Sequence, residues 1–80
     1  MARIDWPDYI EDLLDELDPH EVLLIFEKAR ILRRFPRLYP VRTKGRFRRH
    51  RWVLAGRWIV FYKVADDTVY IRALWPAQIP

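Results

Sequence analysis

Apolar residues in the first half of the chain recur at helical spacing. Acidic residues precede apolar positions that lie three or four apart, which predicts a helix over residues 7–17. Asp18 and Pro19 then have the features of an N-cap and of a first helical residue, and Glu21 falls at the capping-box position. The sequence therefore predicts a second helix that starts at Pro19 and stops before Pro36.

The link between the two predicted helices is very short. Such a link predicts an αα-hairpin with antiparallel helices. We expect the seam of this hairpin to be formed by Leu14 and Leu17 against Val22 and Phe26.

The second half of the chain has the pattern of strands. Three apolar and aromatic runs predict strands over Arg46–Leu54, Arg57–Val64 and Thr68–Trp75, after a loop with prolines and a glycine over Phe35–Gly45. Because the links between these strands are short, the strands must pair antiparallel. Residues 3–4 add a brief edge strand, so the fold class is α+β with three to four strands.

Alternation along the strands predicts which side chains face the helices. If Val64 pairs with Thr68, the face toward the helices carries Ile59, Phe61, Val69, Ile71, Ala73 and Trp75. The opposite face then carries Trp58, Val60, Tyr62, Tyr70, Arg72 and Leu74, a mixture of rings and one cation that suits binding. The register of the basic strand, and so which of its arginines face outward, stays open at this point.

Length and composition exclude several classes of site. A chain of 80 residues supports a single domain over residues 1–80. Cysteine, serine and asparagine are absent and the two histidines, His20 and His50, lie far apart, so we expect no disulfide, no serine-type catalytic triad, no metal and no cofactor. The longest apolar run, Val22–Phe26, is too short to span a bilayer, and we expect a cytoplasmic protein without membrane contact.

The net charge of +4 conceals a division of the chain. Residues 1–27 hold one arginine and nine acidic residues, a net charge of −8, whereas residues 28–80 hold fourteen Lys/Arg and two acidic residues, a net charge of +12. Positive charge and rings are concentrated in residues 46–64, which favours an anionic partner such as nucleic acid. Mutual neutralisation of the two halves is the alternative.

Several segments together resemble the RelE/ParE superfamily of toxins from bacterial type II toxin–antitoxin modules. The likeness rests on Ala29–Pro36 (ARILRRFP), on the basic segment that ends at Gly56, on Gly56–Val64 (GRWIVFYKV), and on the DDTVYI segment that follows. The resemblance implies a helical hairpin on a curved antiparallel sheet. It also implies two partners, a cognate antitoxin and either ribosome-bound mRNA or DNA gyrase.

The resemblance also implies candidate functional residues. RelE-like members cut mRNA on the ribosome without a metal, with basic residues and often a tyrosine. Carried over to this chain, the candidate catalytic residues are His50, Arg51, Arg57 and Tyr62. The candidate nucleic-acid-binding residues are Lys44, Arg46, Arg48, Arg49 and Arg72. Of the candidates, only His50 has an ordinary pKa near neutrality, as a general base requires.

Two departures from the RelE pattern keep alternatives open. Ile59 stands where many members have arginine, and the terminal segment WPAQIP lacks the arginine and tyrosine of the mRNA-cutting members. We therefore expect a toxin that inhibits translation by mRNA cleavage, with a ParE-like gyrase inhibitor as the first alternative. A non-toxic nucleic-acid-binding module is the second.

Overall fold

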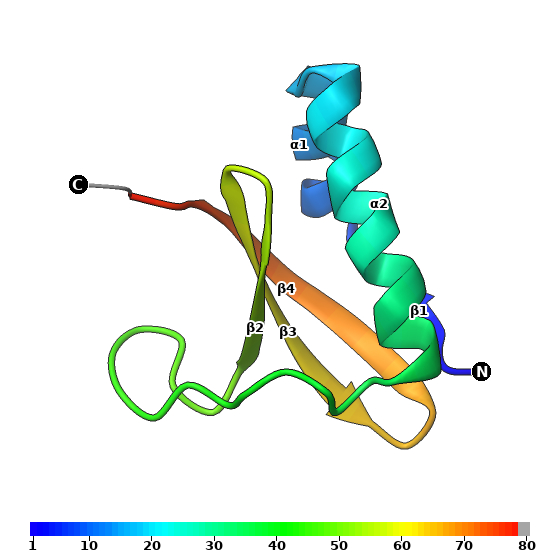
Figure 1. Cartoon of the computed structure of the whole chain (residues 1–80), viewed down its shortest axis with the longest axis vertical. Helices are drawn as coiled ribbons and strands as arrows, with labels where there is room; N and C mark the ends of the chain where they lie inside the picture. The colour runs from blue at the N-terminus through cyan, green and yellow to red at the C-terminus, as the bar shows by residue number, and fades with distance from the viewer. Residues whose placement is uncertain (79–80) are drawn as a thin grey trace.

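The computed structural model describes residues 1–78 and contains two helices and one four-stranded sheet (Figure 1). In chain order, the elements are β1 (Arg3–Asp5), α1 (Asp8–Glu16), α2 (Pro19–Arg34), β2 (Arg51–Ala55), β3 (Trp58–Ala65) and β4 (Thr68–Pro76). The strand order in the sheet is β1-β4-β3-β2. The predicted α+β class is confirmed.

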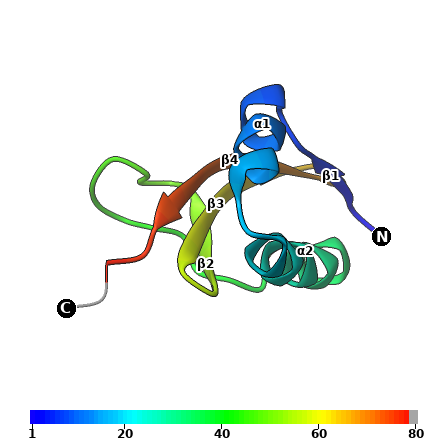
Figure 2. The same cartoon turned by 90° about the horizontal axis from the view of Figure 1, so that it is seen from above.

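Both helices contribute side chains to one core. Ile10 and Leu14 of α1 lie one turn apart and are buried, as are Ile25 and Leu32 of α2. They pack in a single cluster with buried side chains from one face of the sheet: Val53, Ala55, Val60, Tyr62, Val69, Ile71 and Leu74. The helices therefore cover the same sheet face, and the curved sheet wraps around α2 (Figure 2).

The start and end of α2 follow the local signals in the sequence. The Asp18 side chain accepts a hydrogen bond of 2.8 Å from the backbone N–H of His20, and Pro19 is the first helical residue. Arg33 and Arg34 occupy the last turn, where the helix dipole favours cations. Glu21 has a different role from the predicted capping box, because its Oε2 accepts a 2.8 Å hydrogen bond from Nε1 of Trp58.

The predicted helix seam is correct only in part. Leu14, Leu17 and Val22 belong to the core or pack against it. Phe26 is 44% exposed and packs edge-on against Trp6, with 5.4 Å between ring centroids. The sheet holds the two helices together more than a helix–helix seam does.

One strand pairing differs from the prediction of a wholly antiparallel sheet. Strands β2, β3 and β4 pair antiparallel, as expected, but β1 pairs parallel to β4. Both helices lie in the chain between β1 and the β2–β4 meander, and this long connection permits parallel pairing. The sheet is therefore mixed.

The predicted assignment of sheet faces is wrong for β3. Val64 pairs with Val69 and not with Thr68, so the register differs by one residue from the one assumed. A one-residue slip moves every side chain to the other face. As a result Val60 and Tyr62 enter the core, while Ile59 and Phe61 lie on the face away from the helices.

A β-bulge shifts the alternation along β4, so the predicted faces are also wrong there: Leu74 enters the core, while Ala73 and Trp75 lie on the face away from the helices. Tyr62 pairs with Ile71 and Phe61 pairs with Ala73, so Arg72 is an extra residue between them. The bulge keeps Ile71 and Leu74 on the core face although their spacing is odd. The α1 residue Tyr9 caps the bulge, because its hydroxyl donates a hydrogen bond to the Arg72 carbonyl.

The predicted strand over Arg46–Leu54 begins five residues later than expected, at Arg51, and ends at Ala55. Residues 46–49 form turns instead. Within the described residues 1–78, no helix is long and apolar enough to cross a membrane.

The turn between β2 and β3 generates a stability prediction. Gly56 has φ +60°, and a Cβ at this position would lie 2.7 Å from Cδ1 of Leu24 on α2. We expect Gly56→Ala to lower the free energy of unfolding by about 1–2 kcal/mol for the left-handed backbone alone, with a further cost from displacing Leu24. Urea unfolding monitored by circular dichroism measures this change.

Gly45→Ala is the matched control, because Gly45 has φ +84° but a Cβ there would meet only Nε of Arg42, at an ordinary contact distance of 3.9 Å. An unfolding free energy that falls as much in Gly45→Ala as in Gly56→Ala would contradict a steric contribution from Leu24.

Candidate nucleic-acid interface

The loop that leads into β2 concentrates positive charge. We call residues 42–50 the basic loop; they include five Lys/Arg and no acidic residue. All five cations are exposed: Arg42, Lys44, Arg46, Arg48 and Arg49. In Figure 1 the basic loop is the wide green turn on the left, away from both helices. Because like charges at this density repel one another, an anionic ligand would relieve the repulsion.

Backbone hydrogen bonds close the basic loop on itself. The N–H of Arg42 donates to the His50 carbonyl at 2.8 Å, and the N–H of Arg49 donates to the Arg42 carbonyl at 2.7 Å. Gly45 and Arg49 have positive φ values of 84° and 70°, which turn the chain too sharply for a strand. The cations are thus displayed on a closed turn.

An aromatic ring anchors the basic loop to the sheet. Phe47 stacks on Phe61 of β3 with 4.0 Å between ring centroids and 17° between planes. The same Phe47 ring lies edge-on to Trp75 at 5.5 Å and to His50 at 5.7 Å. Phe61 is only 2% exposed. It occupies the face opposite the helices, so its burial agrees with the cover that Phe47 supplies.

The sheet face away from the helices is rich in large apolar and aromatic residues. We call it the outer sheet face; besides Phe61, the register places on it Trp52, Leu54, Ile59, Tyr70, Ala73 and Trp75. Leu54, Tyr70 and Trp75 are between 38% and 47% exposed. Exposed rings on a sheet offer stacking platforms for bases.

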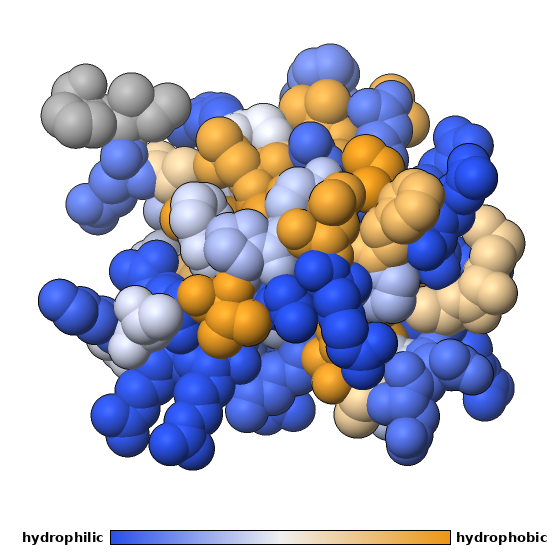
Figure 3. Space-filling view, turned by 60° about the horizontal axis from the view of Figure 1, so that its bottom comes forward, coloured by the Kyte–Doolittle hydropathy of each residue, from blue (hydrophilic) through white to orange (hydrophobic). Residues whose placement is uncertain are grey.

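Two arginines of the basic loop lie over rings of the outer sheet face. The Arg46 guanidinium carbon is 5.3 Å from the ring centroid of Trp75, and that of Arg42 is 5.8 Å from the ring centroid of Phe61. Cation–π contacts at this distance favour these positions. In Figure 3 hydrophilic side chains gather at the lower left, on the side of the basic loop, beside hydrophobic side chains in the middle of the view.

The structure brings together several of the predicted site residues. Lys44, Arg46, Arg48 and Arg49 all project from the basic loop, with half-buried His50 at its end. The His50 Nδ1 lies 3.2 Å from the Arg48 carbonyl oxygen. These five residues form one cationic surface that includes the imidazole of His50.

Arg51 has a structural role beside this surface. Its Nη1 donates hydrogen bonds to the Tyr39 carbonyl at 2.7 Å and to the Arg37 carbonyl at 3.3 Å. Arg51 therefore fastens the segment before the basic loop to β2, and its guanidinium is partly engaged in those bonds.

Two other predicted cations lie outside the basic loop. Arg57 is in the tight turn after β2, and therefore at the opposite end of that strand from His50. Arg72 is exposed at the bulge of β4, two strands away from β2 in the sheet. Neither belongs to the His50 cluster.

Tyr62, predicted as a proton donor, lies in the core. The residue has 0% relative exposure, and its hydroxyl has no hydrogen-bond partner among the described residues. Burial raises the pKa of Tyr62 to about 12, while the nearby Arg51 guanidinium opposes that shift. A hydroxyl that cannot reach solvent cannot donate a proton to a bound phosphate, so this burial counts against a catalytic role.

Phe47 and Trp75 belong to the candidate interface, but the sequence pattern does not identify them. The pattern places Phe47 in a strand and Trp75 on the face toward the helices. Gly45, with cations on both sides, is the one local signal of a turn at this position. Within residues 1–78, no group of three or more His, Asp or Glu side chains is placed to hold a metal ion.

Comparisons with protein-family models, with curated proteins and with solved structures each found no match. The resemblance to RelE/ParE toxins therefore remains a hypothesis that rests on sequence motifs.

The unpaired hydroxyl of Tyr62 generates a prediction. Removing a buried polar group without a partner avoids its desolvation cost, so Tyr62→Phe should leave the free energy of unfolding at pH 7 unchanged or raise it by about 1 kcal/mol. Urea unfolding measures this, and a loss of several kcal/mol would contradict the absence of a partner for the hydroxyl.

The raised pKa of Tyr62 has a consequence at alkaline pH. The folded-state pKa of Tyr62, about 12, exceeds the ordinary value of 10.0, because ionisation is harder in the core than in the unfolded chain. The free energy of unfolding is therefore unaffected by this group below pH 10 and falls as pH rises from 10 toward 12. We expect the wild type to lose more stability over this range than Tyr62→Phe, by at most about 1.4 kcal/mol per pH unit. The two proteins differ only in this hydroxyl. If their free energies of unfolding fell equally between pH 10 and pH 12, the raised pKa of Tyr62 would be refuted.

Proposed function

We propose that this protein binds single-stranded nucleic acid through the basic loop and the adjoining outer sheet face. One observation supports the proposal: the basic loop, which has no acidic residue, lies against a sheet face with exposed rings. The stacking of Phe47 on Phe61 holds the loop there. Cations beside rings suit a flexible strand, since phosphates meet the guanidinium groups while bases stack. A small neutral ligand would leave the charge uncompensated.

We further propose that this binding serves a toxin of the RelE/ParE type that acts on translation. The motifs described in the sequence support the assignment, and two helices on one face of a curved sheet are compatible with it. Its partners would then be ribosome-bound mRNA and a cognate antitoxin. In this function Arg48 and Arg49 would hold the phosphate backbone of the RNA.

Cleavage would place specific demands on His50. Attack of a ribose 2′-hydroxyl on the neighbouring phosphate needs a base for the hydroxyl proton, cations for the charge that develops on the phosphate, and an acid for the leaving oxygen. Arginine cannot serve as the base, because its pKa exceeds 12. His50 is the histidine of this surface and the candidate for the base.

The positions of Tyr62 and Arg57 favour a second candidate function, inhibition of DNA gyrase without hydrolysis. Tyr62 is buried in the core and Arg57 lies at the far end of β2, so neither joins His50 in the present arrangement. An inhibitor that only binds its target needs no general acid. It would still use an exposed cationic surface.

Expression in cells tests the toxin proposal. We expect growth arrest on induction, and we expect co-expression of a cognate antitoxin to relieve it. Purified protein assayed in parallel for translation, mRNA integrity and gyrase supercoiling would separate the two targets. If gyrase supercoiling were inhibited while the mRNA stayed intact, mRNA cleavage would be excluded. If cells grew normally although the protein was well expressed, only the non-toxic nucleic-acid-binding module would remain.

The basic loop yields a binding prediction. Arg48→Gln with Arg49→Gln should weaken binding of a short fluorescent single-stranded RNA roughly tenfold, because two exposed phosphate contacts are lost. The slope of log affinity against log salt should become shallower by about 0.7 for each lost contact. Fluorescence anisotropy over a series of salt concentrations measures both effects.

Arg57→Gln is the control for the loss of one positive charge and is compared with Arg48→Gln alone, since Arg57 is exposed at the other end of β2. An equal loss of RNA affinity in this control would place the interface elsewhere, while circular dichroism checks that each variant is folded.

A further inference from the structure

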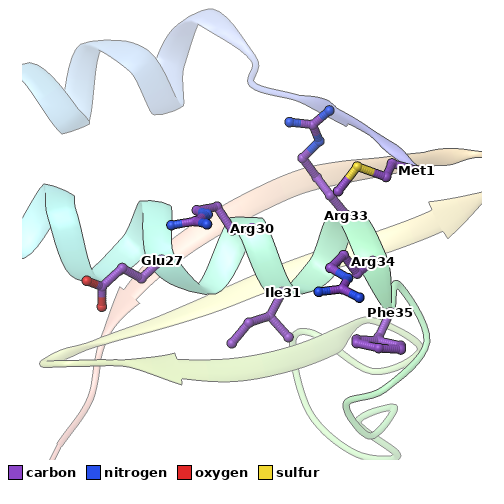
Figure 4. Close-up of a pocket in the computed structure, with 7 residues that line it drawn as sticks. All are labelled: Met1, Glu27, Arg30, Ile31, Arg33, Arg34 and Phe35. Atoms are coloured by element: carbon purple, nitrogen blue, oxygen red, sulfur yellow. The ribbon is translucent and has the colours of Figure 1, made fainter.

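A second cationic surface surrounds the C-terminal half of α2, away from the basic loop. A hollow of about 550 Å³ is lined there by Met1, Glu27, Arg30, Ile31, Arg33, Arg34 and Phe35. Figure 4 shows these residues along the C-terminal half of α2, with Met1 and Arg33 on one side of the helix and Ile31 and Phe35 on the other. The hollow is thus lined by both apolar and cationic side chains.

Two neighbouring hollows extend this surface in both directions. One shares Arg30 and Arg33 with the first and continues to Trp6 and Phe26, with a volume of about 430 Å³. The other shares Arg34 and Phe35 and continues to Leu38, with a volume of about 340 Å³. Together they form a belt around the helix end, which we call the α2 belt. A belt of three joined hollows is more extended than a compact small-molecule pocket.

The α2 belt combines charge with exposed apolar surface. Five arginines line it against a single acidic residue, Glu27, which gives a net side-chain charge of +4: Arg3, Arg30, Arg33, Arg34 and Arg37. Phe26, Phe35 and Leu38 on the same belt are 44%, 54% and 59% exposed. Arginine beside exposed aromatic residues is typical of protein–protein hot spots.

Two of the arginines are already oriented. The Arg33 Nε donates a 3.3 Å hydrogen bond to the Ala2 carbonyl, and the Arg34 guanidinium carbon lies 5.6 Å from the centroid of the Phe35 ring. Pre-orientation of Arg34 lowers the entropy cost of its two-pronged contact with a carboxylate.

We propose that the α2 belt is the docking site for an acidic, amphipathic peptide segment of a partner protein. Carboxylates of the segment pair with Arg30 and Arg34, and its apolar side chains fill the hollows beside Phe35 and Phe26. Glu27 disfavours a continuous phosphate backbone at this place but accepts a hydrogen bond from a peptide N–H or a basic side chain. The site is separate from the basic loop and does not rest on the nucleic-acid proposal.

Selection from a random peptide phage-display library against the full chain tests the proposal. We expect the enriched peptides to combine Asp or Glu with large apolar residues. The synthetic form of an enriched peptide should bind about tenfold more weakly to Arg30→Gln with Arg34→Gln, because two charge-assisted contacts are lost. Phe35→Ala should weaken it independently.

As a control, each double variant is tested against the ligand of the other surface. Arg48→Gln with Arg49→Gln should leave peptide affinity unchanged, and the Arg30 and Arg34 variant should leave the affinity for single-stranded RNA unchanged. No enrichment, or enriched peptides without acidic residues, would overturn the proposal. The proposal would also be overturned if replacing Arg30 and Arg34 abolished RNA binding, or if the replacement left peptide affinity unchanged.

Failure of the nucleic-acid proposal would be visible separately. In that case the affinity for RNA would not change in the Arg48 and Arg49 variant, whether or not the peptide binds the α2 belt. Circular dichroism of each variant checks that α2 is intact.

Discussion

The pairing of β3 with β4 decides which side chains can act on a ligand. Val64 opposite Val69 turns Tyr62 and Val60 into the core, and the extra residue Arg72 keeps Leu74 there as well. The same register leaves Phe61 and its neighbours on the other face, where the basic loop lies against them. Had the strands paired one residue differently, Phe47 would have had no ring beneath it and the loop no anchor.

The negative charge of α1 and the positive charge of the basic loop lie on opposite sides of the sheet. The acidic side chains of α1 are exposed on an element that packs on the sheet with its apolar stripe, and the basic loop is on the opposite side of the sheet. Hydrogen bonds of the guanidinium groups of Arg33, Arg42 and Arg51 go to backbone carbonyls. Such bonds fix the direction of a cation without neutralising it, so the positive potential remains available to a ligand.

The sequence predicts well what depends on neighbouring residues, and poorly what depends on distant ones. The Asp18–Pro19 cap and the stop before Pro36 are local, and both ends of α2 are as expected. The pairing of Val64 with Val69 and the bulge at Arg72 depend on how two strands pack, so alternation alone predicts the wrong faces for β3 and for the end of β4. The cations of the candidate site were found from charge density. Phe47 and Trp75 were missed, because an apparent strand pattern hid the turn that begins at Gly45.

The way in which the basic loop is held in shape determines which of its side chains can change during evolution. Its shape is held by main-chain hydrogen bonds, by two residues with left-handed backbone and by the single ring of Phe47. The side chains of Lys44 and Arg48 take no part in closing it. They can therefore be exchanged without altering the main-chain frame of the loop, so a new target can be acquired by changing side chains on an unchanged frame.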